Sequence, residues 1–437
     1  MIRFATLAFA TAIGLAAPAR AEVDIQLVTS DGGIDAWLVE EHSLPFVALE
    51  IAFLGGTSLD AEGKRGAVNL MTGLLEEGSG DLDAREFARA KETLATSLGF
   101  SAGSEYLSIS ARFLTENFDA SVALLRDAVQ KPQFNEADIE RVRAQVLSGL
   151  AFAAKDPNDI ASEAFAQMAY GAHPYGTAEE GTVETVSALT RDDLVAAHRN
   201  LLVRDNVLVG AVGDITPEQL GALLDAVLGP LPETGARMPP KVEPQIEGGL
   251  TVVEFDTPQS VALFGQRGIA VDDEDYFAAV LLNQILGGGS FESRLMTEVR
   301  EKRGLTYGVY SYLYPRDLAN AYMGSVSSSN DRIAEAISVI RAQWQLAAEE
   351  GVTAQELENA KTYLTGAYPL RFDGNSTIAG ILVGMQTIGL DTEYVKTRNA
   401  RVERVTLEDV QRVAARLLDP AQLHFVVVGK PEGLASE

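Results

Sequence analysis

Residues 190–213, TRDDLVAAHRNLLVRDNVLVGAVG, are matched in design by residues 406–429, TLEDVQRVAARLLDPAQLHFVVVG. Each stretch opens with a Thr followed three positions later by an Asp, a capping-box variant that satisfies free N–H groups at a helix start. Each predicted helix leads into an apolar strand, over 206–212 or 423–428, and then a Gly. The two stretches are 216 residues apart, close to half the chain, so the sequence predicts an internal duplication.

A second pair of matching segments supports the duplication. In the first half an apolar helical stripe stops before Pro132, and Asn135 then caps a further helix; the stripe comprises Val122, Leu125 and Val129. In the second half Thr353 with Glu356 caps the corresponding helix, and the preceding stripe comprises Ile333, Ile337, Ile340 and Trp344. Two matches in the same order are hard to obtain by chance.

Strand-like runs at 46–53, 107–113 and 260–266 alternate with long helices. We therefore expect an α+β fold of two duplicated lobes, each a mostly antiparallel sheet with helices packed on one face. The expected boundaries are an N-terminal lobe at 22–228, a linker at 229–249 and a C-terminal lobe at 250–437. The linker holds five prolines, which lack a backbone donor and favour an extended chain.

The first 21 residues have the pattern of an export signal. Arg3 supplies a positive start, residues 4–17 are an apolar run, and Ala19-Arg20-Ala21 fits a small-x-small cleavage site. The run is shorter than the roughly 20 apolar residues of a membrane span. We expect cleavage after Ala21, giving a soluble protein that is periplasmic in a Gram-negative cell. The alternative is a buried N-terminal helix.

Charge and cysteine content exclude several function classes. The formal net charge of −27 disfavours binding to nucleic acid or to anionic membrane surfaces, and we expect no integral membrane association. The chain has no Cys, which excludes thiol nucleophiles, thiolate zinc sites and iron–sulfur clusters.

The histidines do not form a metal-binding pattern. Hydrolytic zinc needs about three His or carboxylate ligands with an open position for water. The chain has only His42, His173, His198 and His424, and no two lie within five residues. We interpret all four as structural and expect this chain to bind no metal. His173 belongs to the turn-forming run His173-Pro174-Tyr175-Gly176.

Other catalytic motifs are weak. There is no Gly-x-Ser-x-Gly elbow. The run Gly287-Gly288-Gly289-Ser290 lacks the Lys-Ser/Thr of a phosphate-binding loop, so a flexible or peptide-contacting loop is the better interpretation.

A polar cluster at 294–310 remains. Arg300 lies near a predicted helix end that Gly304 breaks, and Tyr307 precedes a predicted strand. The two side chains could meet across this corner and hold a peptide carbonyl or a developing oxyanion. On spacing alone, a structural Arg–Glu pair with a tyrosine at the edge of the core is the favoured interpretation.

Residues 293–311, with Ser293-Arg294-Leu295 and the run EVREKRGLTYGVYS at 298–311, resemble the second-half signature of M16 (insulinase or pitrilysin-like) peptidases. The landmarks at 173–176, 190–194 and 212–215 are also similar, and the resemblance covers essentially the whole mature chain. In that family an Arg and a Tyr seven positions apart bind substrate near the zinc and help to stabilise the transition state. The resemblance implies that role for Arg300 and Tyr307, with the Gly287–Gly289 loop helping to position the peptide.

The chain departs from the family at the metal site. Active members carry His-x-x-Glu-His in the first half, where this chain has Asn69, Thr72 and Gly73 at the positions of the first His, the Glu and the second His. Their third ligand, a Glu, would fall near residues 141–155, which contain no Asp or Glu. Glu76 and Glu77 lie nearby but are expected to be solvated.

The resemblance therefore implies an M16B-type non-catalytic subunit. Its expected partner is an M16 chain with His-x-x-Glu-His that carries the zinc, and its expected ligand is a peptide substrate. Two alternatives stay open. One is a catalytically dead structural or peptide-binding protein; the other is a stand-alone peptidase with an unusual metal site, which the histidine count disfavours.

Overall fold

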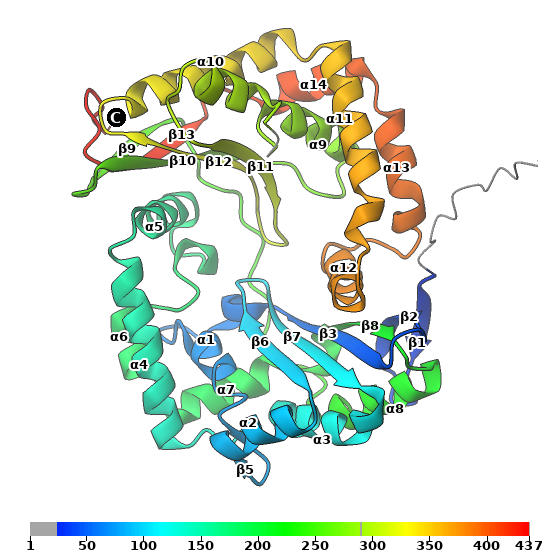
Figure 1. The fold of residues 1–437 in the computed structure, drawn as a ribbon. Coiled ribbons are helices and arrows are strands. Elements are labelled where there is room, and N and C mark those ends of the chain that lie inside the picture. Colours follow the sequence, from blue (N-terminus) through cyan, green and yellow to red (C-terminus); the bar gives the residue numbers. More distant parts are fainter. Residues whose placement is uncertain (1–23, 289–290, 437) are drawn as a thin grey trace, which may run out of the picture.

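The computed structural model describes residues 24–288 and 291–436 and shows two lobes, each built on one large sheet (Figure 1). The predicted signal peptide lies outside the described residues. The N-terminal sheet has the strand order β1-β2-β8-β3-β7-β6, with strands β1 (Gln26–Thr29), β2 (Asp35–Glu40), β3 (Phe46–Leu54), β6 (Ser97–Ala102), β7 (Tyr106–Leu114) and β8 (Val207–Gly213). The C-terminal sheet has the order β11-β12-β10-β13-β9, with strands β9 (Gly249–Glu254), β10 (Gln259–Arg267), β11 (Val309–Pro315), β12 (Asn320–Ser329) and β13 (His424–Gly429).

The two sheets share one topology, which confirms the predicted duplication. The order β2-β8-β3-β7-β6 in the first corresponds to β9-β13-β10-β12-β11 in the second. In each set, the strand that comes first along the chain pairs in parallel with the strand that comes last: β2 with β8, and β9 with β13. The other strand pairs of these two sheets are antiparallel. Each lobe is therefore mostly antiparallel, as expected.

Helices flank both sheets, most of them on the outer faces (Figure 1). In the first half they are α1 (Ala67–Thr72), α2 (Ala84–Thr93), α3 (Phe118–Gln130), α4 (Glu136–Ala153), α5 (Pro157–Tyr170), α6 (Val183–Ala188), α7 (Arg191–Leu201) and α8 (Pro217–Val227), with a short hairpin of β4 (Gly78–Ser79) and β5 (Leu82–Asp83). In the second half they are α9 (Tyr276–Leu286), α10 (Ile333–Glu350), α11 (Ala354–Ala367), α12 (Asn375–Thr387), α13 (Tyr394–Arg404) and α14 (Leu407–Leu417). The predicted stripes of α3 and α10 are buried.

The predicted helix starts are mostly capped as expected. The side chains of Thr190, Thr353 and Thr406 each accept a hydrogen bond from the backbone N–H three residues on, and the acidic partner returns the bond. The prediction for Asn135 is wrong in its chemistry, although α4 does begin there. Its side chain accepts no capping hydrogen bond; its Nδ2 donates to Gln133 Oε1 at 2.8 Å.

The inner face of each sheet is crossed by a helix from the other half of the chain. Helix α5 packs on β10 and β13, and helix α12 packs on β3 and β8. A glycine permits each close approach: a Cβ on Gly210 would lie 2.8 Å from the Ala379 carbonyl oxygen, and one on Gly265 would lie 2.8 Å from Phe165 Cζ. The two sequence halves are thus interlocked, and neither sheet is covered by its own half alone.

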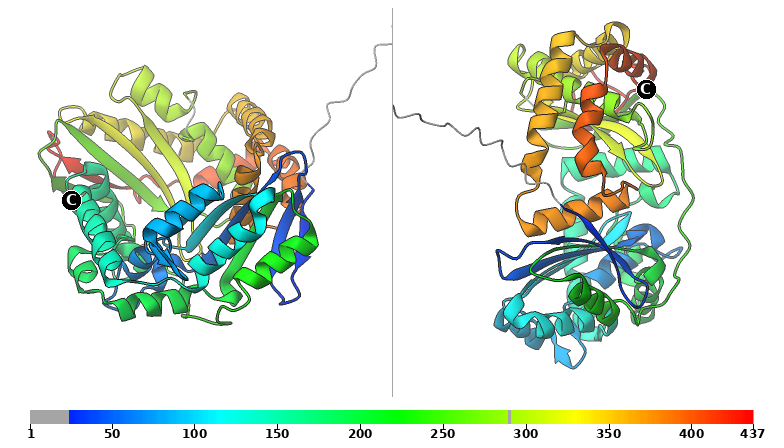
Figure 2. Two further views of the ribbon diagram at one scale, coloured as in Figure 1. Left: turned by 60° about the horizontal axis from the view of Figure 1, so that its bottom comes forward. Right: turned by 90° about the vertical axis from the view of Figure 1, so that its right-hand side faces the viewer.

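Residues 229–248 form no helix or strand and run along one side of the molecule to β9 (Figure 2, right). The proline-rich composition of this stretch accounts for that. Among the described residues, no helix is long and apolar enough to cross a membrane.

Candidate functional site

The degenerate zinc position lies where α1 packs against α4. Thr72 is buried, and its hydroxyl donates to the Val68 carbonyl at 2.7 Å, inside its own helix. Gly73 has no side chain, and a Cβ there would already lie 3.1 Å from Val142 Cγ1 on α4. Asn69 supplies only a neutral amide. These groups do not fit zinc, because a hydrolytic site needs about three imidazole or carboxylate ligands.

Helix α4 gives no third ligand. The α4 residues that face the space between the lobes are Val146, Gly149, Leu150, Phe152 and Ala153, all without donor atoms on their side chains. Throughout residues 24–288 and 291–436, no group of three or more His, Asp or Glu side chains is placed to hold a metal ion.

Glu76 and Glu77 are partly exposed, and both form ion pairs. Glu76 forms an ion pair with Lys91, and Glu77 forms one with Arg141 of α4. The carboxylates are therefore used to attach neighbouring helices, which a sequence separation of 15 or 64 residues does not reveal.

The histidines make structural contacts. His42 is exposed and bonds Asp214 at 2.8 Å and Glu40 at 3.2 Å, and these bonds raise its pKa. His198 is largely buried and bonds the Val129 carbonyl at 2.7 Å; burial lowers its pKa. His424 bonds the Glu247 carbonyl and Thr251. His173 accepts from the Tyr175 N–H at 3.2 Å in the predicted turn.

Arg300 lies at the end of the π-helical turn Met296–Glu301, and Gly304, with φ of 59°, ends this segment before β11. The Arg300 guanidinium lies 4.7 Å from the ring centroid of Phe291. The adjacent carboxylate of Glu298 binds Lys302 at 2.6 Å and Arg303 at 2.7 Å. Across the described residues no carboxylate pairs with Arg300, so the structural Arg–Glu pair favoured by spacing is not observed.

Tyr307 is 89% exposed and precedes β11. It is therefore not a tyrosine at the edge of the core. No hydrogen bond joins Tyr307 to Arg300 in the described part of the chain. Among the described residues the Arg300 guanidinium has no carboxylate partner, and the Tyr307 phenol is largely exposed.

The predicted glycine loop has a structural function in its first two residues. The Gly287 carbonyl accepts from the Ser311 N–H at 2.9 Å, and a Cβ on Gly287 would lie 2.4 Å from Ser311 Oγ. A Cβ on Gly288 would lie 2.7 Å from Gln284 Cα. Both glycines thus allow close packing at the end of α9. Gly289 lies outside the described residues.

Arg294 fixes this corner to the rest of the lobe. Its guanidinium forms a two-point contact with Glu356, Nε to Oε1 at 2.7 Å and Nη2 to Oε2 at 2.8 Å. The same carboxylate caps α11 by accepting from the Thr353 N–H at 2.7 Å. Burial raises the pKa of Glu356, but the bonds to Arg294 and Thr353 outweigh it and bring the pKa to about 2. The capping box of Thr353 and Glu356 was predicted. The contact of the same Glu356 carboxylate with Arg294, 62 residues away in sequence, was not.

The equivalent hairpins of the two lobes meet at their tips. Arg316, after β11, bonds the hydroxyl of Ser104, after β6, and its Nε lies 3.8 Å from Glu105. The Glu105 carboxylate also accepts from the Asp317 N–H at 2.7 Å and from the Tyr175 hydroxyl. This interlobe lock, defined by Ser104, Glu105, Tyr175 and Arg316, joins residues about half the chain apart.

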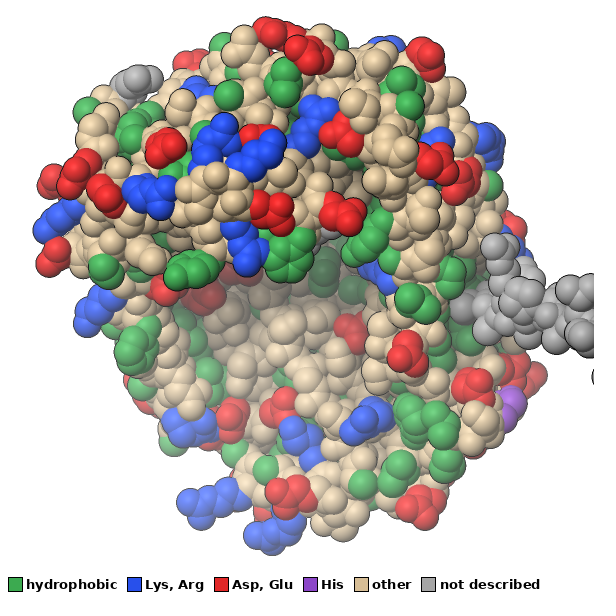
Figure 3. Space-filling view, turned by 45° about the horizontal axis from the view of Figure 1, so that its top comes forward, with side chains coloured by type: hydrophobic (Ala, Val, Ile, Leu, Met, Phe, Trp, Pro, Cys, Tyr) green, Lys and Arg blue, Asp and Glu red, His purple; other side chains and the backbone are tan. Residues whose placement is uncertain are grey.

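The surface is hollowed between the two lobes (Figure 3). A cavity of about 1080 Å³ lies beside the interlobe lock. Its walls are the end of α4, one side of α5, the segment 175–183 and, from the C-terminal sheet, Leu263, Tyr312, Tyr314, Arg316 and Met323. We call this space the interlobe cavity.

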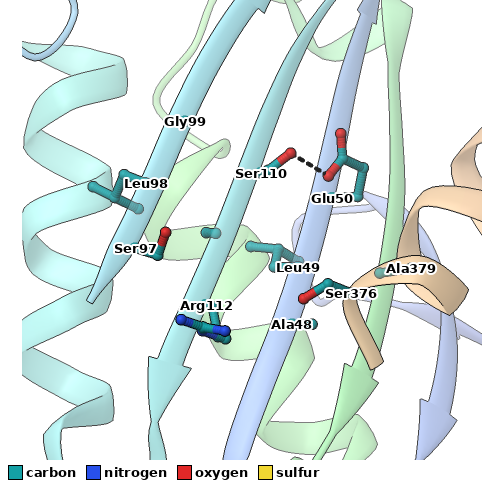
Figure 4. A pocket seen from close by; sticks show the side chains of 11 residues that line it. Ala48, Leu49, Glu50, Ser97, Leu98, Gly99, Ser110, Arg112, Ser376 and Ala379 are labelled. Atoms are coloured by element: carbon teal, nitrogen blue, oxygen red, sulfur yellow. Dashed lines mark hydrogen bonds between the residues drawn. The ribbon is translucent and has the colours of Figure 1, made fainter. Parts of the chain in front are cut away.

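A smaller hollow of about 270 Å³ lies on the N-terminal sheet beside the start of α12 (Figure 4). Here the Ser110 hydroxyl donates to the Glu50 carboxylate at 2.6 Å. Burial raises the pKa of Glu50, and the bond from Ser110 opposes this only partly. Ser376 and Ala379 of α12 form one side. Each hollow is thus bounded by a sheet and by the helix that crosses from the other half.

The family models match both halves of the chain. The model described as insulinase (peptidase family M16) matches residues 37–183, and the one described as peptidase M16 inactive domain matches residues 188–364. A non-peptidase homolog, YmxG, of Helicobacter pylori is 27% identical and the match covers 89% of this chain and 90% of that protein. An uncharacterized zinc protease of Streptomyces coelicolor is 28% identical over 81% of this chain and 78% of its own.

Solved structures of M16 proteins have the same fold as this chain. A peptidase M16 inactive domain from Pseudomonas fluorescens superimposes with a TM-score of 0.87 at 29% identity, covering 95% of this chain and 99% of that one. A protease from Helicobacter pylori, at 18% identity, shares the fold with a TM-score of 0.84 over 93% of this chain and 100% of that one. The degenerate position on α1 and α4 has none of the ligands that zinc hydrolysis requires. The chain therefore belongs to peptidase family M16 and is a non-catalytic member of it.

Proposed function

We propose that this protein is the non-catalytic subunit of a heterodimeric zinc metalloendopeptidase. Its partner is an M16 chain with His-x-x-Glu-His, which holds the zinc. Arg300 and Tyr307 of this chain bind the peptide backbone beside that zinc and stabilise the developing oxyanion.

The observation that carries the proposal is the state of Arg300 and Tyr307. A charged guanidinium that merely stabilises a lobe normally has a carboxylate partner, yet Glu298 is used by Lys302 and Arg303. A tyrosine kept for packing is normally at least half buried, whereas Tyr307 is 89% exposed. Phe291 and the Arg294–Glu356 contact hold the corner in shape. Such donors are ready to bind an oxyanion.

The location follows from the N-terminal export pattern. We infer that residues 1–21 are removed after Ala21 and that the mature subunit works in the periplasm. The test is the N-terminal sequence of the protein recovered from the periplasmic fraction: Glu22 is expected, and an intact Met1 in the cytosolic fraction would contradict it.

The main experiment mixes the purified mature chain with its M16 partner and measures peptide cleavage and zinc content. We expect neither chain alone to cleave and the mixture to cleave, with zinc on the partner only. Arg300→Met and Tyr307→Phe should each lower the rate about 100-fold, as for loss of one oxyanion donor, with dimer affinity unchanged. Arg267→Met and Tyr363→Phe, both at exposed positions of the same half, are the matched controls.

A structural or peptide-holding protein without any catalytic contribution is the second candidate. Its support is the close packing around Gly287 and Gly288, which indicates that this loop also serves the fold. It predicts that Arg300→Met and Tyr307→Phe behave like the controls. Stoichiometric zinc on this chain with cleavage by it alone would overturn both candidates.

A further inference from the structure

The backbone that leads to Tyr307 is held by side chains from the connection between β12 and α10. Tyr307 lies within residues 302–308, which form no helix or strand between the π-helical turn and β11. In the described structure Tyr307 makes no hydrogen bond of its own, and its side chain is largely exposed. Its position therefore depends on its neighbours along the chain.

Arg332, at the N-cap position of α10, holds two of these neighbours. Its Nη1 donates to the Gly304 carbonyl at 2.9 Å, and its Nη2 donates to the Arg303 carbonyl at 2.8 Å. Both carbonyls follow the π-helical turn, where the last carbonyls of a helical segment need donors. Because a guanidinium is planar, its two N–H groups fix the orientation of both carbonyls. Arg332 thereby sets the direction in which the chain continues toward Tyr307.

The end of β12 holds the next two residues. The hydroxyl of Ser328 donates to the Leu305 carbonyl at 2.5 Å, and the Leu305 side chain is buried. The hydroxyl of Thr306 donates to the Ser327 carbonyl at 2.6 Å and accepts from the Gly308 N–H at 3.1 Å. All four residues before the tyrosine are thus attached to the β12–α10 connection.

Arg332 makes the largest contribution among these contacts. Hydrogen bonds from a charged donor are stronger than those between neutral groups. Loss of Arg332 removes two such bonds from adjoining carbonyls, whereas loss of Ser328 removes one neutral bond. In the part of the chain that the structure describes, no carboxylate pairs with Arg332, although Asp331 precedes it in sequence. The guanidinium is therefore committed to this backbone.

Such support matters for a phenol that stabilises an oxyanion. Donors of this kind act at roughly 2.7–3.1 Å from the oxyanion. A misplacement of about 1 Å can lower a rate about 100-fold. An exposed side chain on an irregular segment reaches that precision only if the backbone beneath it is held. The contacts of Arg332 and Ser328 supply this condition for Tyr307.

We propose that Arg332 is a positioning residue that places the Tyr307 phenol for the oxyanion in the partner's zinc site. It acts through the backbone of residues 303–306 and touches neither peptide nor zinc. This inference rests on the proposed function and deepens it, because it names what holds one of the two donors in place. Since the oxyanion exists only in the transition state, loss of Arg332 should lower kcat and leave KM nearly unchanged.

The first test measures cleavage kinetics of the mature chain mixed with its M16 partner. Arg332→Met should lower kcat about tenfold and change KM by less than about twofold. Arg332→Lys keeps the charge but not the two-point contact, so its kcat should lie between those of wild type and Arg332→Met. In a Tyr307→Phe background, Arg332→Met should lower kcat no further. An equal further loss in that background would show a general structural effect and overturn the proposal.

Arg341 provides the matched control. It also lies on α10, and its guanidinium also bonds two backbone carbonyls, of Gly249 at 3.0 Å and of Pro420 at 3.5 Å. Neither carbonyl belongs to the segment that leads to Tyr307. Arg341→Met should therefore lower resistance to urea without changing kcat. A loss of kcat equal to that of Arg332→Met would overturn the proposal.

A second test uses the mature chain alone, labelled with ¹⁵N-tyrosine, and measures the backbone order parameter of Tyr307 by NMR. It should be about 0.85 in the wild type and in Arg341→Met, and below about 0.6 in Arg332→Met. Ser328→Ala should lower it less, and it tests the same support if Arg332→Met does not fold. An unchanged order parameter in Arg332→Met and Ser328→Ala would refute the positioning role.

The outcomes separate this inference from the proposed function. If Tyr307→Phe leaves the rate of the mixture unchanged, the role of Tyr307 is wrong and the positioning role of Arg332 falls with it. If Tyr307→Phe lowers kcat but Arg332→Met does not, only the positioning role is wrong.

Discussion

The guanidinium carbon of Arg316, from the C-terminal half, lies 3.3 Å from the ring centroid of Tyr175, from the N-terminal half. The Tyr175 hydroxyl bonds Glu105, whose carboxylate also faces Arg316. Burial, together with the bond to Glu105, raises the pKa of Tyr175 well above its usual range, so the phenol remains a donor. The contact fixes how the two repeats face each other, and thereby the shape of the cavity between them.

We expect Arg316→Met to destabilise the protein by about 3 kcal/mol, because it leaves the carboxylate of Glu105 without its cation in a largely buried place. Urea unfolding measures this. The exposed Arg89→Met is the control and should change stability by less than about 0.5 kcal/mol. A double variant with Glu105→Gln should lose much less than the sum of the singles; simple additivity would show that the two side chains do not act together.

The helix crossings can be tested with alanine. Gly210→Ala should cost about 1–3 kcal/mol, because its Cβ would meet the Ala379 carbonyl on α12 at 2.8 Å. Gly380→Ala, on α12 itself, has open space around the new methyl and should stabilise the helix by about 0.5–1 kcal/mol. Thermal unfolding gives both values. The same sign for both variants would contradict the assigned packing.

Restoring the His-x-x-Glu-His motif at positions 69–73 should not produce zinc binding by this chain. The triple variant Asn69→His, Thr72→Glu, Gly73→His supplies two ligands and a base, but α4 still offers no third ligand. Thr72→Glu also places a carboxylate at a buried position, and Gly73→His pushes against Val142. We expect lower thermal stability and no stoichiometric zinc by metal analysis of the dialysed protein. Tight zinc binding by the triple variant would contradict the inference that the chain lacks a third zinc ligand.

Acid should weaken the Arg294–Glu356 contact. The pKa of Glu356 falls from the usual 4.5 to about 2 in the folded protein. A carboxylate with a lowered folded pKa contributes stability that is complete above about pH 4.5 and disappears as the pH falls toward 2. The free energy of unfolding of the wild type should therefore exceed that of Glu356→Gln at neutral pH. Urea titrations should show this difference becoming smaller as the pH falls from about 4.5 toward 2. Glu358→Gln is the control, and a gap independent of pH would contradict the assignment.

Local sequence signals located most of the elements. Thr190, Thr353 and Thr406 each carry their acidic partner three residues on, and a capping box depends only on neighbours along the chain. Apolar periodicity placed the core helices for the same reason. The strand predicted at 206–212 begins one residue later, at Val207, because residues 204–206 form a short 3₁₀ turn. Asn135 shows the limit: it stands at the N-cap position of α4, yet its side chain accepts no capping hydrogen bond.

The missing zinc ligands followed from the sequence alone, because counting side chains shows which chemistry is impossible. The state of Arg300 and Tyr307 did not follow from it. Spacing favoured a structural pair, and only the fold shows Glu298 engaged by other cations and Tyr307 exposed. The crossing of α5 and α12 and the meeting of Arg316 with Tyr175 were likewise decided in three dimensions. Such contacts join residues far apart along the chain, and no local pattern encodes which of two equivalent sheets a helix will cover.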